Sequence, residues 1–167
     1  MRVAVLSDTH GRLGPVRLLR GRLGAVDFLL HAGDFHADAR ACAAIFGLPP
    51  DRVAAVVGNC DFPDQEPAEQ VLELEGVRIV LVHGHRHDAK KGPLRVYLRA
   101  RELGCRVAVF GHSHVPLLEE HEGVLLLNPG SPSFPRLPGK PGSCAVLELG
   151  PDGPAARHVW LDGSRSL

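Results

Sequence analysis

The sequence has no long hydrophobic run, no net charge and no closely spaced pair of cysteines. Its first apolar segment covers only residues 3–6, too short for the core of a signal peptide, and no later stretch approaches the length of a membrane span. The formal net charge is zero and no basic or acidic run is sustained. We therefore expect neither extended nucleic-acid binding nor adhesion to an anionic membrane. Together these absences predict a cytoplasmic protein.

The four cysteines lack CxxC spacing, and methionine, tryptophan and tyrosine each occur once. A chain of 167 residues, 44% of them hydrophobic, is long enough for one well-buried domain and short for two. We therefore expect a single domain over residues 1–167, with free thiols because a chain of this size does not need disulfides. Histidine is the exception to this scarcity, since it occurs ten times.

The beginning of the chain joins a strand pattern to two metal-ligand side chains. Residues 3–6 form an apolar run with β-branched residues, which is typical of a strand buried on both faces. The run is followed by Asp8 and His10, two positions apart, and then by Gly11. We expect this strand to deliver both side chains to a metal site.

Four later apolar runs stop in the same way, at Asp, Asn or His beside Gly. These endings are Gly33-Asp34, Gly58-Asn59-Cys60-Asp61, His83-Gly84-His85 and Gly111-His112-Ser113-His114. Any one of these polar residues alone is well explained as a helix cap or a turn residue. Five strand ends with the same residue types favour a shared function instead.

Hydrophobic periodicity predicts three helices and ten strands. The helices are expected at residues 15–23, 37–46 and 93–103. The strands are expected at residues 3–6, 26–31, 52–57, 70–74, 77–82, 105–110, 116–120, 124–127, 143–149 and 155–161. Residues 129–142, rich in proline and glycine, are expected to form an irregular loop.

The order of these elements predicts an α/β (α+β) fold with two sheets. The first five alternate strand and helix, which indicates a parallel sheet with ligands at the carboxyl ends of its strands. The later strands are hairpin-like and have few helices between them. We therefore expect two mixed sheets packed face to face, with helices on the outside and the strand ends converging at one rim.

Seven candidate ligands would meet at that rim, too many for one metal ion and sufficient for two. They are Asp8, His10, Asp34, Asn59, His83, His112 and His114. Asp34 lies in the middle of the set and is the candidate for a carboxylate that bridges two cations. Such a pair of ions, ~3.5 to 4 Å apart, stabilises the attacking and leaving oxygens of a phosphoryl displacement.

The motifs Asp8-x-His10, Gly33-Asp34, Gly58-Asn59-x-Asp61, His83 and Gly111-His112-x-His114 occur in the order found in the calcineurin-like metallophosphoesterase superfamily, which the chain resembles. The short chain and its Asn-Cys-Asp sequence look like the small YfcE-type phosphodiesterase branch. The resemblance implies a four-layer αββα sandwich and a metal-bridging hydroxide as nucleophile. It also implies one metal held by Asp8, His10, Asp34 and His114, and another held by Asp34, Asn59, His83 and His112.

The chain departs from the wider superfamily at Cys60, where many members have a histidine thought to contact the phosphate and help the leaving group depart. Without that imidazole, the resemblance favours diesters over doubly charged monoesters as substrates. We expect Cys60 to be a small, partly buried thiol rather than a ligand. The matching Asp61 is expected to orient a neighbouring group.

Two further features complete the expected site. Asn59 and His85 are expected to give hydrogen bonds to the substrate, although a solvated loop histidine is an equally good interpretation of His85. With Asp61, they make up the predicted catalytic residues. The segment Asn128-Pro129-Gly130-Ser131, often present in the family, is expected to shape the rim without supplying a ligand.

The predicted activity is hydrolysis of a small phosphodiester by water activated between two divalent cations. The imidazole-rich set favours Mn²⁺, Fe, Co²⁺, Ni²⁺ or Zn²⁺ over Mg²⁺ alone, with Mn²⁺ our first expectation. Alternatives are a phosphomonoesterase or phosphoprotein phosphatase, and a non-catalytic scaffold of the same fold. A homo-oligomer is compatible with the sequence.

Overall fold

The computed structural model of the chain describes residues 1–62 and 67–164. Within these ranges the three helices are α1 (Gly14–Leu23), α2 (Asp38–Phe46) and α3 (Leu94–Glu102), with two short 3₁₀ turns at Pro50–Arg52 and His85–His87. The strands are β1 (Arg2–Leu6), β2 (Phe28–His31), β3 (Val53–Ala55), β4 (Glu69–Leu74), β5 (Val77–Val82), β6 (Val107–Val109), β7 (Leu117–His121), β8 (Val124–Asn128), β9 (Ser143–Gly150) and β10 (Gly153–Trp160). The predicted elements are confirmed, with ends that differ by one or two residues, and residues 129–142 are irregular as expected.

The strands form two mixed five-stranded sheets. The first has the order β10-β9-β1-β2-β3, and the second has the order β4-β5-β6-β8-β7. In the first sheet β1, β2 and β3 are parallel, and in the second β5, β6 and β8 are parallel. The remaining strands pair antiparallel with their neighbours.

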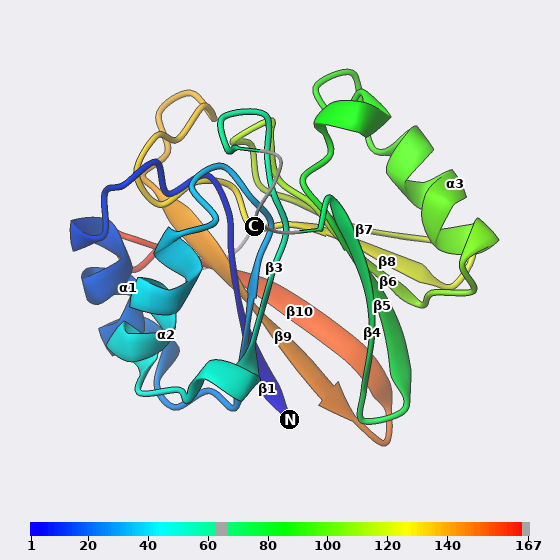
Figure 1. Cartoon of the computed structure of the whole chain (residues 1–167), viewed down its shortest axis with the longest axis horizontal. Coiled ribbons are helices and arrows are strands. Elements are labelled where there is room, and N and C mark those ends of the chain that lie inside the picture. The colour runs from blue at the N-terminus through cyan, green and yellow to red at the C-terminus, as the bar shows by residue number, and fades with distance from the viewer. Residues whose placement is uncertain (63–66, 165–167) are drawn as a thin grey trace.

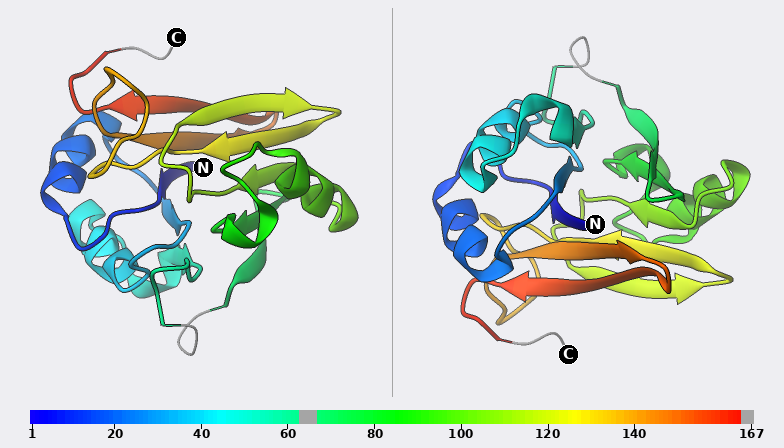
Figure 2. Two further views of the ribbon diagram at one scale, coloured as in Figure 1. Left: turned by 90° about the horizontal axis from the view of Figure 1, so that it is seen from above. Right: turned by 90° about the horizontal axis from the view of Figure 1, so that it is seen from below.

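The two sheets face each other, with α1 and α2 outside the first sheet and α3 outside the second (Figures 1 and 2). Alternation along the strands supplies three apolar layers. Val3 and Val5 of β1 pack between the sheets with Ile79 and Leu81 of β5. Ala4, Leu6, Val16 and Leu19 belong to the layer beneath α1 and α2, and Val80, Val82, Val96 and Ala100 to the layer beneath α3. The predicted αββα arrangement is therefore present.

No helix within residues 1–62 and 67–164 combines the length and the apolar character that a membrane span requires.

His31, the last residue of β2, is fully buried and connects two loops at the carboxyl ends of β1 and β2. The Thr9 hydroxyl donates to the Asp38 carboxylate at 2.7 Å, so it accepts the proton of His31 Nε2 at 3.1 Å. Nδ1 of His31 then accepts the Gly33 N–H at 3.3 Å. Burial lowers the pKa of His31 to about 4, with Asp38 offsetting part of the effect. His31 is therefore a neutral connector at pH 7.

This neutral histidine predicts a loss of stability in acid. The unfolded chain binds a proton at His31 near pH 6.5 and the folded chain only at about 4. Between these values acid favours unfolding by up to about 1.4 kcal/mol per pH unit. His31→Asn cannot titrate, so the stability advantage of the wild type over this variant should shrink as the pH falls, as measured by urea unfolding.

The exposed position His121 provides the matched control, since His121→Asn should change stability little at any pH. Other titrating groups are common to the wild type and the variants and cancel in the difference. A stability difference between wild type and His31→Asn that stays constant across this pH range would show that His31 does not contribute this dependence.

Candidate metal centre

The predicted ligands follow the carboxyl ends of five strands drawn from both sheets. Asp8 and His10 follow β1, Asp34 follows β2, Asn59 follows β3, His83 follows β5, and His112 and His114 follow β6. Two hydrogen bonds tie the sheets together here. The His112 N–H donates to Asp8 Oδ2 at 3.1 Å, and His83 Nδ1 donates to the Ala32 carbonyl at 2.6 Å. The structure thus brings the ends of both sheets to one rim.

Asp8, His10, Asp34 and His114 form a compact group whose ligand atoms lie within 4.8 Å of one another. His114 Nε2 lies 3.2 Å from Asp8 Oδ1 and 3.4 Å from His10 Nε2. His10 Nε2 lies 3.8 Å from Asp34 Oδ2. These are the four residues that the family resemblance assigns to one metal.

The hydrogen bonds around this group leave one nitrogen of His114 and one oxygen of Asp8 facing each other. His114 Nδ1 donates to the Phe134 carbonyl at 2.7 Å, so Nε2 is the ring nitrogen that remains to face Asp8. Asp8 Oδ1 is buried and has no hydrogen-bond partner within the described residues. A ring nitrogen fixed by a carbonyl is the usual arrangement for a histidine ligand. Two imidazole nitrogens and a buried carboxylate oxygen therefore fit a divalent cation.

A second group surrounds His83. Its Nε2 lies 3.2 Å from Asn59 Oδ1 and 3.4 Å from Asp34 Oδ1, and its ring centroid lies 5.1 Å from that of His112. Because Nδ1 of His83 is bound to the Ala32 carbonyl, Nε2 is the nitrogen left for a ligand. These residues are the set that the resemblance assigns to the other metal.

Asp34 lies between the two groups, with Oδ2 toward His10 and Oδ1 toward His83. Burial opposes its ionisation, but hydrogen bonds from His83 and from the Cys60 N–H keep the pKa of Asp34 well below its usual range. Burial likewise opposes ionisation of Asp8, and His114 and His83 outweigh it, so the pKa of Asp8 is lowered. Both carboxylates are ionised at neutral pH.

The backbone of the rim is strained. Nine non-glycine residues in the described part of the chain have positive φ, and five of them are predicted ligands. These five are Asp8, His10, Asp34, His112 and His114, with φ between 47° and 67°. The left-handed conformation costs an L-residue about 1–2 kcal/mol. Such strain persists only where the surrounding structure imposes it, which is typical of functional sites.

Two glycines allow the strand ends to approach so closely. A Cβ at Gly58 would overlap the carboxylate of Asp34, and a Cβ at Gly111 would overlap Ser7 and crowd Asp8. The glycine beside the ligand in each motif therefore provides the space in which the carboxylate lies.

Asp61 holds the backbone of two ligand-bearing loops. Its Oδ1 accepts the N–H groups of Phe35 at 2.7 Å and His36 at 3.0 Å, and its Oδ2 accepts that of Gly58 at 2.8 Å. Its carboxylate thus contacts the residues that follow Asp34 and the residue that precedes Asn59. This geometry suits a positioning role.

His85 and Cys60 both lie near the second group. The His85 ring centroid is 5.3 Å from that of His83 and 6.1 Å from that of His112. Burial lowers the pKa of His85, and the neighbouring His83 lowers it further. Cys60 is exposed, not partly buried as we expected, because its loop holds it at the surface, where Asn59 Nδ2 donates to its Sγ at 3.3 Å. Partial loss of solvent around the thiolate, followed by the hydrogen bond with Asp34, raises the pKa of Cys60 to about 11.

The loop after β8 supports the rim through contacts that sequence reasoning did not find. The Ser131 hydroxyl donates to the Asp8 carbonyl at 2.8 Å, and Asn128 Nδ2 donates to the Gly111 carbonyl at 2.9 Å. Phe134, whose carbonyl binds His114, was also not predicted. The Asn-Pro-Gly-Ser motif was the one sequence signal for this loop. It supplies hydrogen bonds to the ligand-bearing backbone and no ligand to either group.

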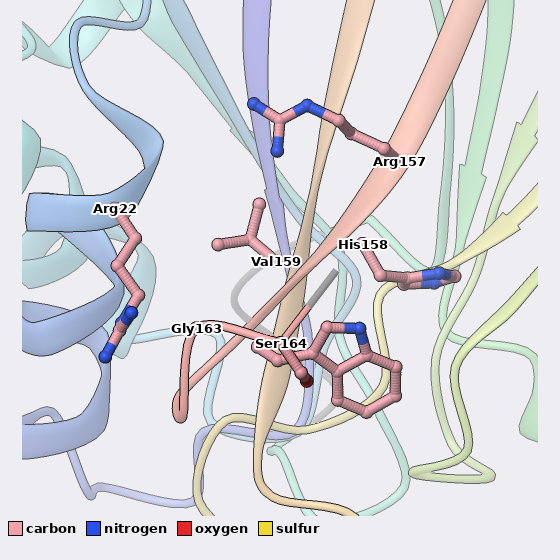
Figure 3. A pocket seen from close by; sticks show the side chains of 7 residues that line it. Arg22, Arg157, His158, Val159, Gly163 and Ser164 are labelled. Carbon is pink, nitrogen blue, oxygen red and sulfur yellow. The ribbon is translucent and has the colours of Figure 1, made fainter. Parts of the chain in front are cut away.

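Two cavities lie outside the rim. One, of about 640 Å³, lies between Arg22 of α1 and Arg157, Val159 and Trp160 of β10 (Figure 3). The other, of about 810 Å³, is lined by residues of α2 and β3. Neither cavity is lined by a predicted metal ligand.

Comparison with known proteins gives relatives along nearly the whole chain. Probable metallophosphoesterase YsnB of Bacillus subtilis (strain 168) is 39% identical over 165 residues, covering 98% of this chain and 94% of the relative. Phosphodiesterase YfcE of Escherichia coli (strain K12) is 33% identical over 171 aligned positions, covering 89% and 88%.

A solved structure shows the same fold. The crystal structure of a predicted phosphoesterase from Streptococcus pneumoniae TIGR4 superposes with a TM-score of 0.77 at 29% identity, covering 98% of this chain and 91% of the other. The model of the calcineurin-like phosphoesterase superfamily domain matches residues 1–152. The chain therefore belongs to the calcineurin-like phosphoesterase superfamily, a family of phosphoesterase hydrolases.

Proposed function

We propose that this protein hydrolyses a small phosphodiester with water, using two divalent cations that share Asp34. The observation that carries the proposal is the position of the Asp34 carboxylate. One of its oxygens faces His10 and the other faces His83, so each belongs to a different ligand group. Two cations at such a site lower the pKa of water and neutralise phosphate oxygens.

The residues present suit borderline transition metals. Asp8, His10, Asp34 and His114 would hold one ion, and Asp34, Asn59, His83 and His112 the other. Four imidazoles among seven ligands favour Mn²⁺, Fe, Co²⁺, Ni²⁺ or Zn²⁺ over Mg²⁺ alone, and we propose Mn²⁺.

Asn59 and His85 are the proposed substrate contacts. With Oδ1 turned toward His83 and one N–H given to Cys60 Sγ, the amide nitrogen of Asn59 keeps a second N–H that can donate to a phosphate oxygen. His85 lies on the same rim with a lowered pKa, so its neutral imidazole can exchange a hydrogen bond with the ester. Hydrolysis joins the water oxygen to phosphorus and breaks one ester P–O bond, and the leaving alkoxide or phenolate takes up a proton.

Cys60 bears on the class of substrate. Its thiol, with a pKa of about 11, is a weak acid at neutral pH and donates a proton poorly to a leaving group. We therefore propose diesters with good leaving groups, rather than monoesters, as the better substrates. The Escherichia coli relative named phosphodiesterase YfcE supports this choice.

The shared carboxylate gives the first test of the proposal. Asp34→Asn removes the charge that both ligand groups use, so bound metal should fall at both positions. Hydrolysis of bis(4-nitrophenyl) phosphate should fall by more than about 100-fold, ~2.7 kcal/mol of transition-state stabilisation. Elemental analysis of the purified, Mn²⁺-loaded protein measures the first effect and the release of nitrophenolate the second.

His10→Ala provides a comparison, since it should reduce bound metal at one ligand group only. His121→Ala is the control and should reduce bound metal at neither group. Two ions per chain in Asp34→Asn would contradict the shared ligand.

A second prediction concerns the leaving group. Mn²⁺-loaded protein should hydrolyse bis(4-nitrophenyl) phosphate faster than 4-nitrophenyl phosphate, and a chelator should abolish both activities.

Cys60→Ala should keep its metal and stay within about tenfold of the wild-type diesterase rate, or ~1.4 kcal/mol. Cys60→His should raise monoester turnover, up to about 10²-fold if the imidazole reaches the leaving oxygen. Loss of metal and activity in Cys60→Ala would instead make this thiol part of the site.

A third prediction separates positioning from catalysis at Asp61. Asp61→Asn places an amide NH₂ among the three N–H groups that the carboxylate now accepts. Metal affinity should fall by about 10–100-fold, as for other supporting residues. Titration of the metal-free protein with Mn²⁺, followed by calorimetry, measures this fall, and the exposed Asp51→Asn is the control. Unchanged metal affinity with a large loss of kcat would point to direct catalysis instead.

A further inference from the structure

An aromatic wall stands beside the metal centre, formed by Phe35, Phe134 and the guanidinium of Arg12. The ring of His10 lies against both phenylalanines, with centroids 5.7 Å from Phe35 and 5.3 Å from Phe134. Arg12 covers Phe134, with its guanidinium carbon 4.5 Å from the ring centroid. Phe35 and Phe134, from two different loops, thus meet around one predicted ligand, and Arg12 from the loop of that ligand covers Phe134.

The position of Phe35 is imposed and leaves its side chain in water. Phe35 directly follows Asp34, has φ of 73° and is 42% exposed. A bulky residue in the left-handed region is uncommon, and here the Asp61 carboxylate holds its N–H. Exposed aromatic rings beside a polar site are typical of surfaces that bind a partner or a ligand.

Phe134 is fixed just as firmly in an irregular loop. Its N–H donates to the Ser131 hydroxyl at 2.9 Å, and its carbonyl accepts from His114 Nδ1 at 2.7 Å. The Arg12 carbonyl accepts a hydrogen bond from Ser133 at 2.8 Å, which ties the loops together. Hydrogen bonds within the protein therefore hold the loops of the wall in place without a ligand.

Arg12 keeps its charge available. It is exposed, and no carboxylate in the described part of the chain lies within 4.0 Å of its guanidinium. A guanidinium stacked on one ring can also contact a second planar group or a ligand oxygen.

We infer that Phe35, Phe134 and Arg12 form a subsite that binds a planar aromatic group carried by the ester oxygen that remains on phosphorus when the leaving group departs. This inference rests on the proposed function. A diester held at the rim directs one organic group along the protein surface, and this wall lies next to His10. Stacking on aromatic side chains accepts a nucleobase or a simple aryl ring alike. The wall thus selects for an aromatic substituent. A nucleobase is separated from phosphorus by a sugar and a simple aryl ring is not, so the distance of the preferred ring from phosphorus distinguishes the two kinds of substrate.

Three esters with the same 4-nitrophenolate leaving group test the subsite on Mn²⁺-loaded protein. They are the methyl, phenyl and thymidine-5′ esters of 4-nitrophenyl phosphate. The phenyl or the thymidine ester should exceed the methyl ester by about tenfold or more in kcat/KM. The faster of the two tells whether the wall receives a ring next to phosphorus or one beyond a sugar.

Phe35→Leu and Phe134→Leu should each reduce this preference by about fivefold or more, mainly through KM, with metal content unchanged and the methyl ester within about twofold of wild type. Phe35→Tyr, which keeps the ring, should retain the preference. Arg12→Gln should weaken the preference by about threefold, and Arg17→Gln, an exposed arginine on α1, should not. Equal kcat/KM for all three esters in the wild type, or equal losses on all three in the leucine variants, would overturn the subsite.

A binding measurement separates the subsite from the proposed activity. Phenyl phosphate should bind the Mn²⁺-loaded protein about tenfold more tightly than methyl phosphate in calorimetry, and Phe35→Leu should remove the difference. If this difference is found but no ester is hydrolysed, the subsite stands and the proposed function fails. If the esters are hydrolysed and the two phosphates bind equally, the subsite fails and the proposed function stands.

Discussion

Two buried carboxylates, Asp8 and Asp34, lie where the ends of the two sheets meet, and much of the local structure serves to keep them ionised. Each accepts a backbone N–H, from His112 and from Cys60 respectively. Each also faces an imidazole of the opposite sheet. Without these partners, burial of two negative charges would be strongly unfavourable. The same contacts therefore hold the site together and join the two sheets. The positive φ values and the two close glycines allow these contacts to form.

The elements and the candidate ligands could be predicted from sequence because both depend on local patterns. Alternating apolar residues mark the strands, and a polar residue beside glycine marks each strand end. Parallel order in the first third of the chain then places Asp8, Asp34 and Asn59 on one edge without any knowledge of packing.

The partners of the supporting residues could not be predicted, although Asp61 was expected to orient a neighbouring group, because they depend on which backbone groups lack partners after folding. Asp61 accepts three N–H groups that only the assembled loops bring together. His31, for which the sequence pattern predicts no function, joins Thr9 to Gly33 through a tautomer that is fixed by the hydrogen bonds of these two partners. The exposure of Cys60 likewise follows from the path of its loop rather than from the residue type.

The place of β1 within its sheet has a consequence for synthesis of the chain. β1 pairs with β2 on one side and with β9 on the other, and β9 lies more than a hundred residues later in the sequence. Contacts of such long range form slowly, since the chain must close a large loop first. During synthesis Asp8 and His10 precede β9 by more than a hundred residues, so the sheet that holds them gains its second flanking strand only after residues 143–150 are translated. The backbone around the candidate metal centre is therefore complete only late in synthesis, after β9 has paired with β1.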